Sequence, residues 1–240
     1  MRLLIGVFRL ADEVLRSGSE ILKMGLAEKN DALLQQGWKM AEKAQGKIYE
    51  LVMDMLSYSK EREPAVEMTD INALAQEVVE LCAPRAKELG VKLDHSPGEH
   101  LPQIPVDPEG VHRALLNIVG NALDAVEDRK NPQVKVGTRA DPEAGWVRIL
   151  VLDNGVGIPS PNLSDIFKPF VSSKGAKGTG LGLAVSRKIL REHGGDILVQ
   201  SQPGKTTTFI LRLPIKSPLL QDVNVSTGSH AALKVPPPAN

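Results

Sequence analysis

The sequence is short of cysteine, of aromatic residues and of net charge. Its one cysteine, Cys82, cannot form a disulfide within the chain, which excludes a disulfide-stapled secreted domain and favours a reducing compartment, the cytoplasm. Lys and Arg total 29, as do Asp and Glu, so the zero net charge indicates neither nucleic acid nor an anionic membrane surface as a partner. No apolar run approaches the roughly 20 residues that cross a bilayer, so we expect no membrane segment in this chain.

The remaining composition is that of a globular protein. Hydrophobic residues make up 42% of the 240 residues and charged residues 24%. A chain of this length and composition holds one or two domains and enough apolar surface for a core. Aromatic residues are only 3% of the total, so Phe167 and Phe170, close together, indicate a specific packing requirement.

The first informative segment is Asn117-Ile-Val-Gly-Asn121-Ala-Leu-Asp124. On a helix, Asn117 and Asn121 lie on one face because residues four apart are neighbours. Two stacked amides can hold a hydrated cation. Taken alone, such a pair is also typical of a solvated helix face.

Two glycine-containing segments follow. In Asp153-Asn-Gly155-Val-Gly157-Ile158, a carboxylate that can accept from an exocyclic amine stands before glycines, which let the backbone approach a flat ring. Residues 178–183, Gly-Thr-Gly-Leu-Gly-Leu, lead into an apolar helix expected over residues 181–190. The free N–H groups and positive dipole end of such a helix suit phosphate. The three segments together predict one site for a purine nucleotide with its cation.

Two common nucleotide motifs are excluded. The dinucleotide fingerprint G-x-G-x-x-G fails because Leu183 and Val185 occupy the position of its last glycine, counted from either possible start. Residues 204–206 match the end of a P-loop, but Val199 stands where that motif requires its first glycine.

At these residues the chain resembles the catalytic region of bacterial sensor histidine kinases, within the wider GHKL group of ATPases. The resemblance spans about residues 30–215 and follows the family's order of motifs. The matching segments are residues 107–126 (N box), 153–158 (G1 box), 166–170 (F box) and 178–183 (G2 box), with residues 193–195 and 204–209 fitting the closing segment.

The resemblance implies that the nucleotide is ATP and the cation Mg²⁺. It makes Asn121 the Mg²⁺ ligand, gives Asn117 a supporting role, and has Asp153 accept the adenine amino group with a water held by Thr207 or Thr208. The full set of predicted nucleotide-binding residues is Asn117, Asn121, Asp124, Asp153, Gly155, Gly157, Lys174, Lys177, Gly178, Thr179, Gly180, Leu181, Gly182 and Thr207. For Asp124, a structural role on the helix is an equal alternative, and one of the two lysines is alternatively solvated.

Two further expectations concern catalysis. ATP-hydrolysing relatives usually carry a water-activating glutamate where this chain has Asn117, so the resemblance implies a slow ATPase that keeps its γ-phosphate for a protein acceptor. We expect Phe167 and Phe170 to anchor a lid in the core, and His193, at a helix C-terminus, to complement the helix dipole as a cation.

The first quarter of the chain carries two apolar stripes with three-four spacing. Their members are Val7, Leu10, Val14, Ile21 and Met24, then Leu34, Trp38, Ala41, Ile48, Val52 and Met55. With a turn and an N-cap at residues 29–31, this pattern predicts an antiparallel helical hairpin. Two hairpins from two chains would bury the stripes as a four-helix bundle, so we predict a homodimer; packing against the rest of the chain is the alternative.

The second domain is expected to be an α+β fold. A helix capped by Asp70 should run to Gly90 with a kink at Pro84, and strands are expected over residues 91–93, 133–136, 146–152, 196–199 and 207–213, the third of them central. The predicted organisation is a helical hairpin in residues 1–64, a two-layer α/β sandwich of GHKL type in residues 65–215, and a disordered tail in residues 216–240.

One element of the family pattern is absent from this sequence. Sensor kinases carry a phosphoacceptor histidine near the start of the first hairpin helix, a position that falls among residues 5–10 here. The five histidines are His95, His100, His112, His193 and His230, and none lies in the hairpin. The catalytic phosphoacceptor is thus unknown, and autophosphorylation in cis is not implied.

Two functions follow as alternatives. The first is the histidine protein kinase catalytic core of a two-component phosphorelay, which transfers the γ-phosphate to a histidine in trans or on a missing or altered segment. The second is a degenerate ATP-binding dimeric scaffold that docks a response-regulator receiver domain without autophosphorylating. A chaperone-like or mismatch-repair-like ATPase is disfavoured by Asn117 and by the hairpin.

Overall fold

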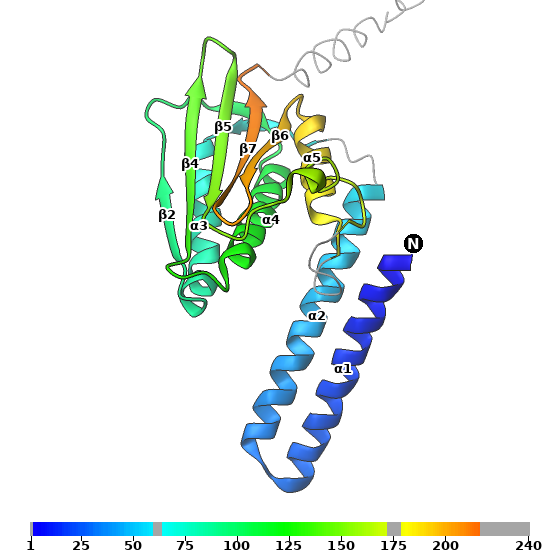
Figure 1. Ribbon diagram of the computed structural model, residues 1–240. Coiled ribbons are helices and arrows are strands. Elements are labelled where there is room, and N and C mark those ends of the chain that lie inside the picture. The colour runs from blue at the N-terminus through cyan, green and yellow to red at the C-terminus, as the bar shows by residue number, and fades with distance from the viewer. Residues whose placement is uncertain (1, 60–63, 172–178, 217–240) are drawn as a thin grey trace, which may run out of the picture.

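The computed structural model describes residues 2–59, 64–171 and 179–216. Helices α1 (Arg2–Glu28) and α2 (Asp31–Ser59) form an antiparallel hairpin that extends away from a mixed α/β domain (Figure 1). At the turn, Lys29 has a positive φ of 53°. The side-chain oxygen of Asn30 accepts from the backbone N–H groups of Ala32 and Leu33 at 3.1 and 3.3 Å, which caps α2. The hairpin is therefore present as predicted.

The two hairpin helices approach each other through small residues. A Cβ on Gly37 would lie 2.8 Å from the carbonyl oxygen of Gly18, and one on Gly25 would lie 2.9 Å from the backbone nitrogen of Leu34. By contrast, two residues of the predicted stripes, Met24 and Trp38, are 52% and 64% exposed. The glycines thus bring the backbones together, which the sequence analysis did not predict, and part of the apolar stripe stays outside the hairpin interface.

A five-stranded sheet forms one layer of the second domain. In spatial order its strands are β2 (Lys92–Ser96), β4 (Gln133–Asp141), β5 (Trp146–Asp153), β7 (Thr206–Pro214) and β6 (Asp196–Gln202). β2 pairs with β4 in parallel and the other pairs are antiparallel, so β5 is central as predicted. Two short strands that were not predicted, β1 (Glu67–Thr69) and β3 (Ile104–Val106), pair with each other.

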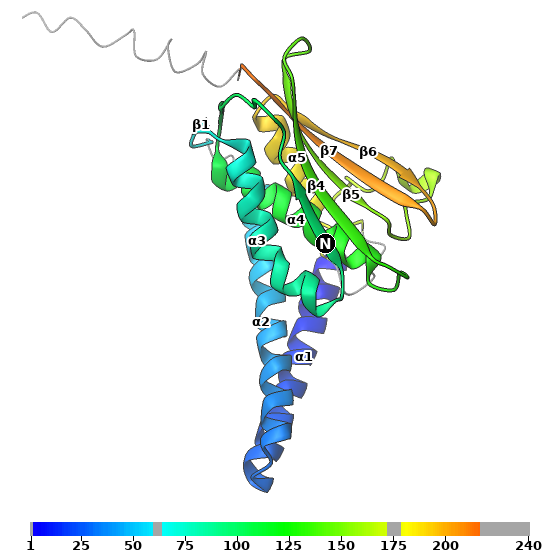
Figure 2. The same ribbon diagram turned by 90° about the vertical axis from the view of Figure 1, so that its left-hand side faces the viewer.

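Three helices form the second layer. α3 (Ile71–Glu88), α4 (Pro108–Val126) and α5 (Gly182–Glu192) lie on the same face of the sheet (Figure 2). The carboxylate of Asp70 caps α3 by accepting from the N–H groups of Asn72 and Ala73, at 2.8 and 3.1 Å. α3 continues past Pro84 to its end before Gly90, whose φ is +65°. A 3₁₀ turn, η1 (Ser160–Asn162), follows the sheet's central strand.

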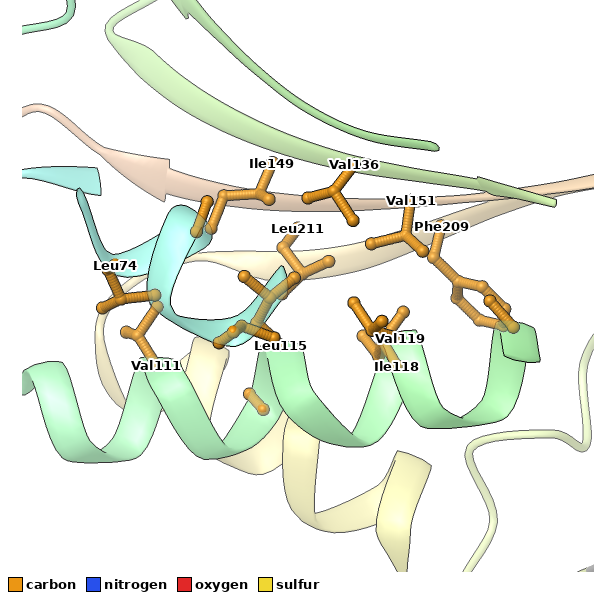
Figure 3. Packing of buried hydrophobic residues seen from close by; sticks show 14 of the residues in the cluster. Leu74, Val111, Leu115, Ile118, Val119, Val136, Ile149, Val151, Phe209 and Leu211 are labelled. Carbon is orange, nitrogen blue, oxygen red and sulfur yellow. The ribbon is translucent and has the colours of Figure 1, made fainter. Parts of the chain in front are cut away.

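The core lies between α4 and the sheet (Figure 3). α4 presents apolar residues at helical spacing to residues of β4, β5 and β7, all at most 5% exposed: Val111, Leu115, Ile118 and Val119 face Val136, Ile149, Val151, Phe209 and Leu211. Each fully buried aliphatic side chain of this kind contributes about 1.5–3 kcal/mol. This packing fixes the rotation of α4 and hence the direction of its polar side chains.

Three features considered in the sequence analysis are Cys82, membrane-spanning segments and the tail. Cys82 is 6% exposed and packs in the core cluster. Across the described ranges, no helix is both long and apolar enough to span a membrane. The expected tail lies, apart from Lys216, outside the described residues.

Candidate functional site

The two asparagines lie one turn apart on α4. Both are half-buried, and Nδ2 of Asn121 lies 3.4 Å from Oδ1 of Asn117. Nδ2 of Asn117 in turn donates to Oγ of Ser186 on α5 at 2.9 Å. The structure therefore places the pair on one helix face, as the spacing predicts, and connects it to the neighbouring helix.

The glycine-rich segment meets this pair at the start of α5. A Cβ on Gly182 would lie 2.5 Å from Oδ1 of Asn117, so only glycine lets the helix start so close to that amide. Before it, the N–H of Leu181 donates to Oγ1 of Thr179 at 3.2 Å, and the carbonyl of Gly180 accepts from the N–H of Phe170 at 2.8 Å. Gly182, the first residue of α5, thus lies directly against Asn117.

Asp153 ends the central strand as a buried carboxylate. Its side chain accepts from the N–H of Gly155 at 2.8 Å, and the residue is 1% exposed. Burial raises the pKa of Asp153 to about 6, although the hydrogen bond from Gly155 acts in the opposite direction. A carboxylate kept in so dry a position is typical of a functional group.

Two hydroxyl groups lie on the neighbouring strands. Thr207, which is opposite Asp153 in the β5–β7 register, is 3% exposed, and its Oγ1 lies 3.0 Å from Oγ of Ser201. Ser201 also accepts from the N–H of Ile158 at 2.8 Å. The G1 segment is therefore tied to β6 and β7 at the edge of the candidate site.

The three predicted segments converge on α4. The N–H of Val156 donates to the carbonyl of Ala125 at 3.2 Å, and a Cβ on Gly155 would lie 2.6 Å from that same carbonyl oxygen. The G1 segment therefore lies against the last turn of α4, one turn beyond Asn121, while the start of α5 lies against Asn117. The carboxylate of Asp153 can accept hydrogen bonds, and the amides of the asparagine pair offer both donors and acceptors.

Gly157 and Gly204 provide a matched pair for testing how tightly the G1 segment is packed. Both have a positive φ, 72° and 73°. A Cβ on Gly157 would lie 2.5 Å from the carbonyl oxygen of Gln202, whereas nothing lies within 4 Å of one on Gly204.

We expect Gly204→Ala to cost about 1 kcal/mol of unfolding free energy, from backbone strain alone. Gly157→Ala should cost about 3 kcal/mol, because overpacking adds to that strain. Urea denaturation of both variants measures the difference. Equal losses would show that the G1 segment is loosely packed.

An arginine of α5 connects the F box, residues 166–170, with β6. Cζ of Arg187 lies 4.6 Å from the centroid of the Phe167 ring, and Nε and Nη2 of Arg187 donate to the Asp196 carboxylate at 2.7 and 3.1 Å. Burial would raise the pKa of Asp196, but the hydrogen bonds from Arg187 and from the Ile197 N–H outweigh it and lower the pKa to about 2. Phe167 and Phe170 both pack against the core, as expected for anchors.

Some predicted site residues are placed elsewhere or not described. Asp124 forms an ion pair with Arg85 of α3, which favours the structural alternative for this residue. Lys174, Lys177 and Gly178 lie outside the described residues. The nucleotide contacts of the other predicted residues stay predictions.

His193 has a structural role for a different reason from the expected one. It is 1% exposed, its Nε2 accepts from the N–H of Asp107 at 2.9 Å, and its Nδ1 lies 2.7 Å from the carbonyl oxygen of Ile189. A ring nitrogen that accepts a hydrogen bond carries no proton, so the ring is neutral and the expected cation at the helix end is wrong. His193 instead joins the end of α5 to the start of α4.

Ser186 and Ser201 were missed by the sequence analysis. The hydrophobic pattern around each serine predicts only a helix or a strand. A serine can lie on the buried or on the exposed face of either element. Their positions became informative only when the structure placed Ser186 beside Asn117 and Ser201 beside Thr207.

Comparisons with known proteins identify sequences similar to this chain. Residues 106–217 match the family model described as "Histidine kinase-, DNA gyrase B-, and HSP90-like ATPase". The chain is 36% identical over 176 residues to the sensor histidine kinase ZraS of Escherichia coli (strain K12), covering 73% of this chain and 37% of that protein. It is 33% identical over 186 residues to the histidine-protein kinase AtoS of the same strain, covering 78% of this chain and 30% of that protein. The chain thus spans only about a third of these curated relatives.

Solved structures give the same result. Full-length ShkA, crystallised in complex with AMPPNP, is 27% identical with a TM-score of 0.67, over 88% of this chain and 46% of that chain. The catalytic domain of the histidine kinase ThkA is 27% identical with a TM-score of 0.56, over 63% of this chain and 96% of that domain. The fold is therefore that of a GHKL-type ATP-binding domain.

Within that class, the chain has sensor histidine kinases among its relatives, and its structure matches histidine kinase catalytic domains.

Proposed function

We propose that this chain is the histidine protein kinase catalytic core of a two-component phosphorelay, which binds Mg-ATP and transfers its γ-phosphate to a histidine on another protein or on a segment not present in this hairpin. The observation that carries the proposal is the convergence of the asparagine pair, buried Asp153 and the start of α5 on helix α4. The similarity to sensor histidine kinases supports it.

The side chains fit the nucleotide and its cation. Mg²⁺ prefers oxygen ligands and is usually held by one or two side chains together with substrate phosphates, so the amide oxygen of Asn121 is a suitable ligand. A Cβ on Gly155 or Gly157 would meet the carbonyl oxygen of Ala125 or of Gln202, so these glycines let the G1 segment pack tightly and hold Asp153 in place. When bound, Mg²⁺ neutralises charge on the phosphates during transfer.

In this proposal each segment has one task. Asp153 accepts from the adenine amino group and orients the base, with Thr207 beside it. Backbone N–H groups at the start of α5 bind the phosphates. Asn117 supports the site with an amide, which cannot remove a proton from water, so hydrolysis is slow and the γ-phosphate is kept for the acceptor histidine.

The hairpin is the proposed interaction element. Trp38 and Met24 are 64% and 52% exposed there, and a second hairpin would bury such residues in a homodimeric four-helix bundle. We propose a response-regulator receiver domain as the partner that docks on this bundle. An ATP-dependent relay and a single buried cysteine fit a cytoplasmic location.

A degenerate regulator is the second candidate function. The observation that favours it is the absence of histidine from residues 1–64. Such a protein would bind Mg-ATP, dimerise and dock a response regulator without completing phosphotransfer.

Incubation with γ-labelled ATP separates the two candidates. The chain is incubated alone, and with a separate hairpin of the same sequence carrying a histidine at one of positions 5–10 in turn. We expect label on a supplied hairpin, none on the chain alone, and ATP hydrolysis much slower than transfer. Label on no protein would contradict the kinase and leave the regulator, and hydrolysis as fast as transfer would contradict the role given to Asn117.

A further inference from the structure

Ser186 is a buried serine on the side of α5 that packs against α4. Ser186 is only 1% exposed. Its Oγ lies 2.9 Å from Nδ2 of Asn117 and 3.4 Å from the carbonyl oxygen of Ala114. Both partners belong to α4, whereas the serine lies one turn beyond the glycine-rich segment, outside the sequence motifs described above.

The structure gives these hydrogen bonds a direction. The hydroxyl proton of Ser186 is donated to the Ala114 carbonyl, which can only accept. Oγ of Ser186 then accepts from Nδ2 of Asn117. The amide of Asn117 therefore has its nitrogen toward α5 and its oxygen toward Asn121, whose Nδ2 is 3.4 Å away.

Gly182, one turn before Ser186 on α5, also packs against the amide of Asn117. A Cβ at that position would lie 2.5 Å from Oδ1 and 2.6 Å from Nδ2 of Asn117. A flipped Asn117 amide would also set its nitrogen against the nitrogen of Asn121, two donors facing each other. A flip of both amides would pair them again, but it would turn the Ser186 proton toward Asn117 and remove its hydrogen bond to the Ala114 carbonyl.

We infer that Ser186 is a positioning residue for the cation site, acting through Asn117 on Asn121. Holding the nitrogen of Asn121 toward Asn117 turns the oxygen of that amide away from Asn117, and oxygen is the atom that would bind Mg²⁺. Ser186 itself touches neither nucleotide nor metal. The inference rests on the proposed function, because it concerns the same site.

The test measures ATP affinity by calorimetry over a series of Mg²⁺ concentrations and in EDTA. Ser186→Ala should raise the apparent Kd for Mg²⁺ about tenfold, the value of one hydrogen bond in a buried network, and leave ATP affinity in EDTA unchanged. Ser186→Cys, of similar size but a weak acceptor, should shift it in the same direction. Ser186→Thr keeps the hydroxyl and should stay within about twofold of the wild type.

Thr138→Val is the matched control. Thr138 is also a buried hydroxyl, 6% exposed, but it serves Gly98 and Asn72 on the side of β4 and α3. Its loss should lower thermal stability without changing the Mg²⁺ dependence. If Ser186→Ala and Ser186→Cys behave like this control, the inference is overturned.

A double-mutant cycle tests whether Ser186 acts through Asn117. Combined with Asn117→Ala, Ser186→Ala should weaken Mg²⁺ binding no further, because the group that it orients is gone. Additive effects would overturn the inference. If the wild-type chain showed no Mg-ATP binding at all, the proposed function would fall first; normal wild-type binding with an unchanged Ser186→Ala variant would remove this inference alone.

Discussion

Asp153→Asn should lose nucleotide affinity and gain stability at neutral pH. One oxygen of Asp153 accepts from the N–H of Gly155, which leaves the other for the adenine amino group. In asparagine, if the oxygen keeps the Gly155 hydrogen bond, the NH₂ group faces the adenine NH₂ as donor against donor. The loss of a charged hydrogen bond of about 1.5–3 kcal/mol corresponds to roughly 10–100-fold weaker ATP binding.

The gain in stability follows from the raised pKa. Burial raises the pKa of Asp153 to about 6, so the folded state binds this proton more tightly than the unfolded state, where the value is 3.8. The destabilising charge therefore develops as the pH rises from about 4 to 6 and is fully present at pH 7 and above. Replacing it with a neutral amide should add about 1–3 kcal/mol there and nothing below pH 4.

Thermal unfolding at pH 4 and pH 7.5, with ATP titration at pH 7.5, measures both effects. Asp128→Asn, at an exposed aspartate, is the control and should change neither quantity. An Asp153→Asn protein that bound ATP normally, or that was less stable than the wild type at pH 7.5, would contradict the role given to this carboxylate.

Asn121→Ala should nearly abolish phosphotransfer. In the proposed site this amide oxygen is the side-chain ligand of Mg²⁺, which supplies several kcal/mol of charge stabilisation in phosphoryl transfer. We expect transfer at saturating ATP to fall about 100–1000-fold. Residue 121 lies at the half-buried face of α4, so little stability should be lost.

The measurement is the initial rate of label transfer to the supplied histidine hairpin, with thermal unfolding to confirm folding. Asn162→Ala, at an exposed asparagine of η1, is the control and should keep the wild-type rate. A rate for Asn121→Ala within a few-fold of the wild type would mean that the cation is held elsewhere.

Local patterns in the sequence predicted most of the fold. The three-four spacing predicted the hairpin, and Asp70 predicted the start of a helix. The continuous apolar run 146–152 predicted the central strand. These predictions were possible because periodicity and capping depend on residues that are close in the sequence. The two short strands β1 and β3 were not predicted: each has three residues, and β3 contains Pro105. Such strands depend on pairing between distant segments rather than on local preference.

The part of the site that depends on residues close in the sequence could be predicted. The contacts between segments far apart in the sequence could not. The spacing of Asn117 and Asn121 fixed their shared face. The Asp124–Arg85 ion pair and the Asn117–Ser186 hydrogen bond join residues 39 and 69 positions apart, so no local pattern indicates them. The close packing of Gly18 and Gly37 was missed for the same reason.

The central claim is a Mg-ATP site between the asparagine pair, Asp153 and the start of α5. Isothermal titration of the folded wild-type chain with ATP at millimolar Mg²⁺ tests it most directly. We predict a saturable heat with one ATP per chain that weakens when Mg²⁺ is removed and when the pH falls through about 6, where Asp153 takes up its proton. A well-folded chain that shows no binding heat at millimolar ATP would contradict the account.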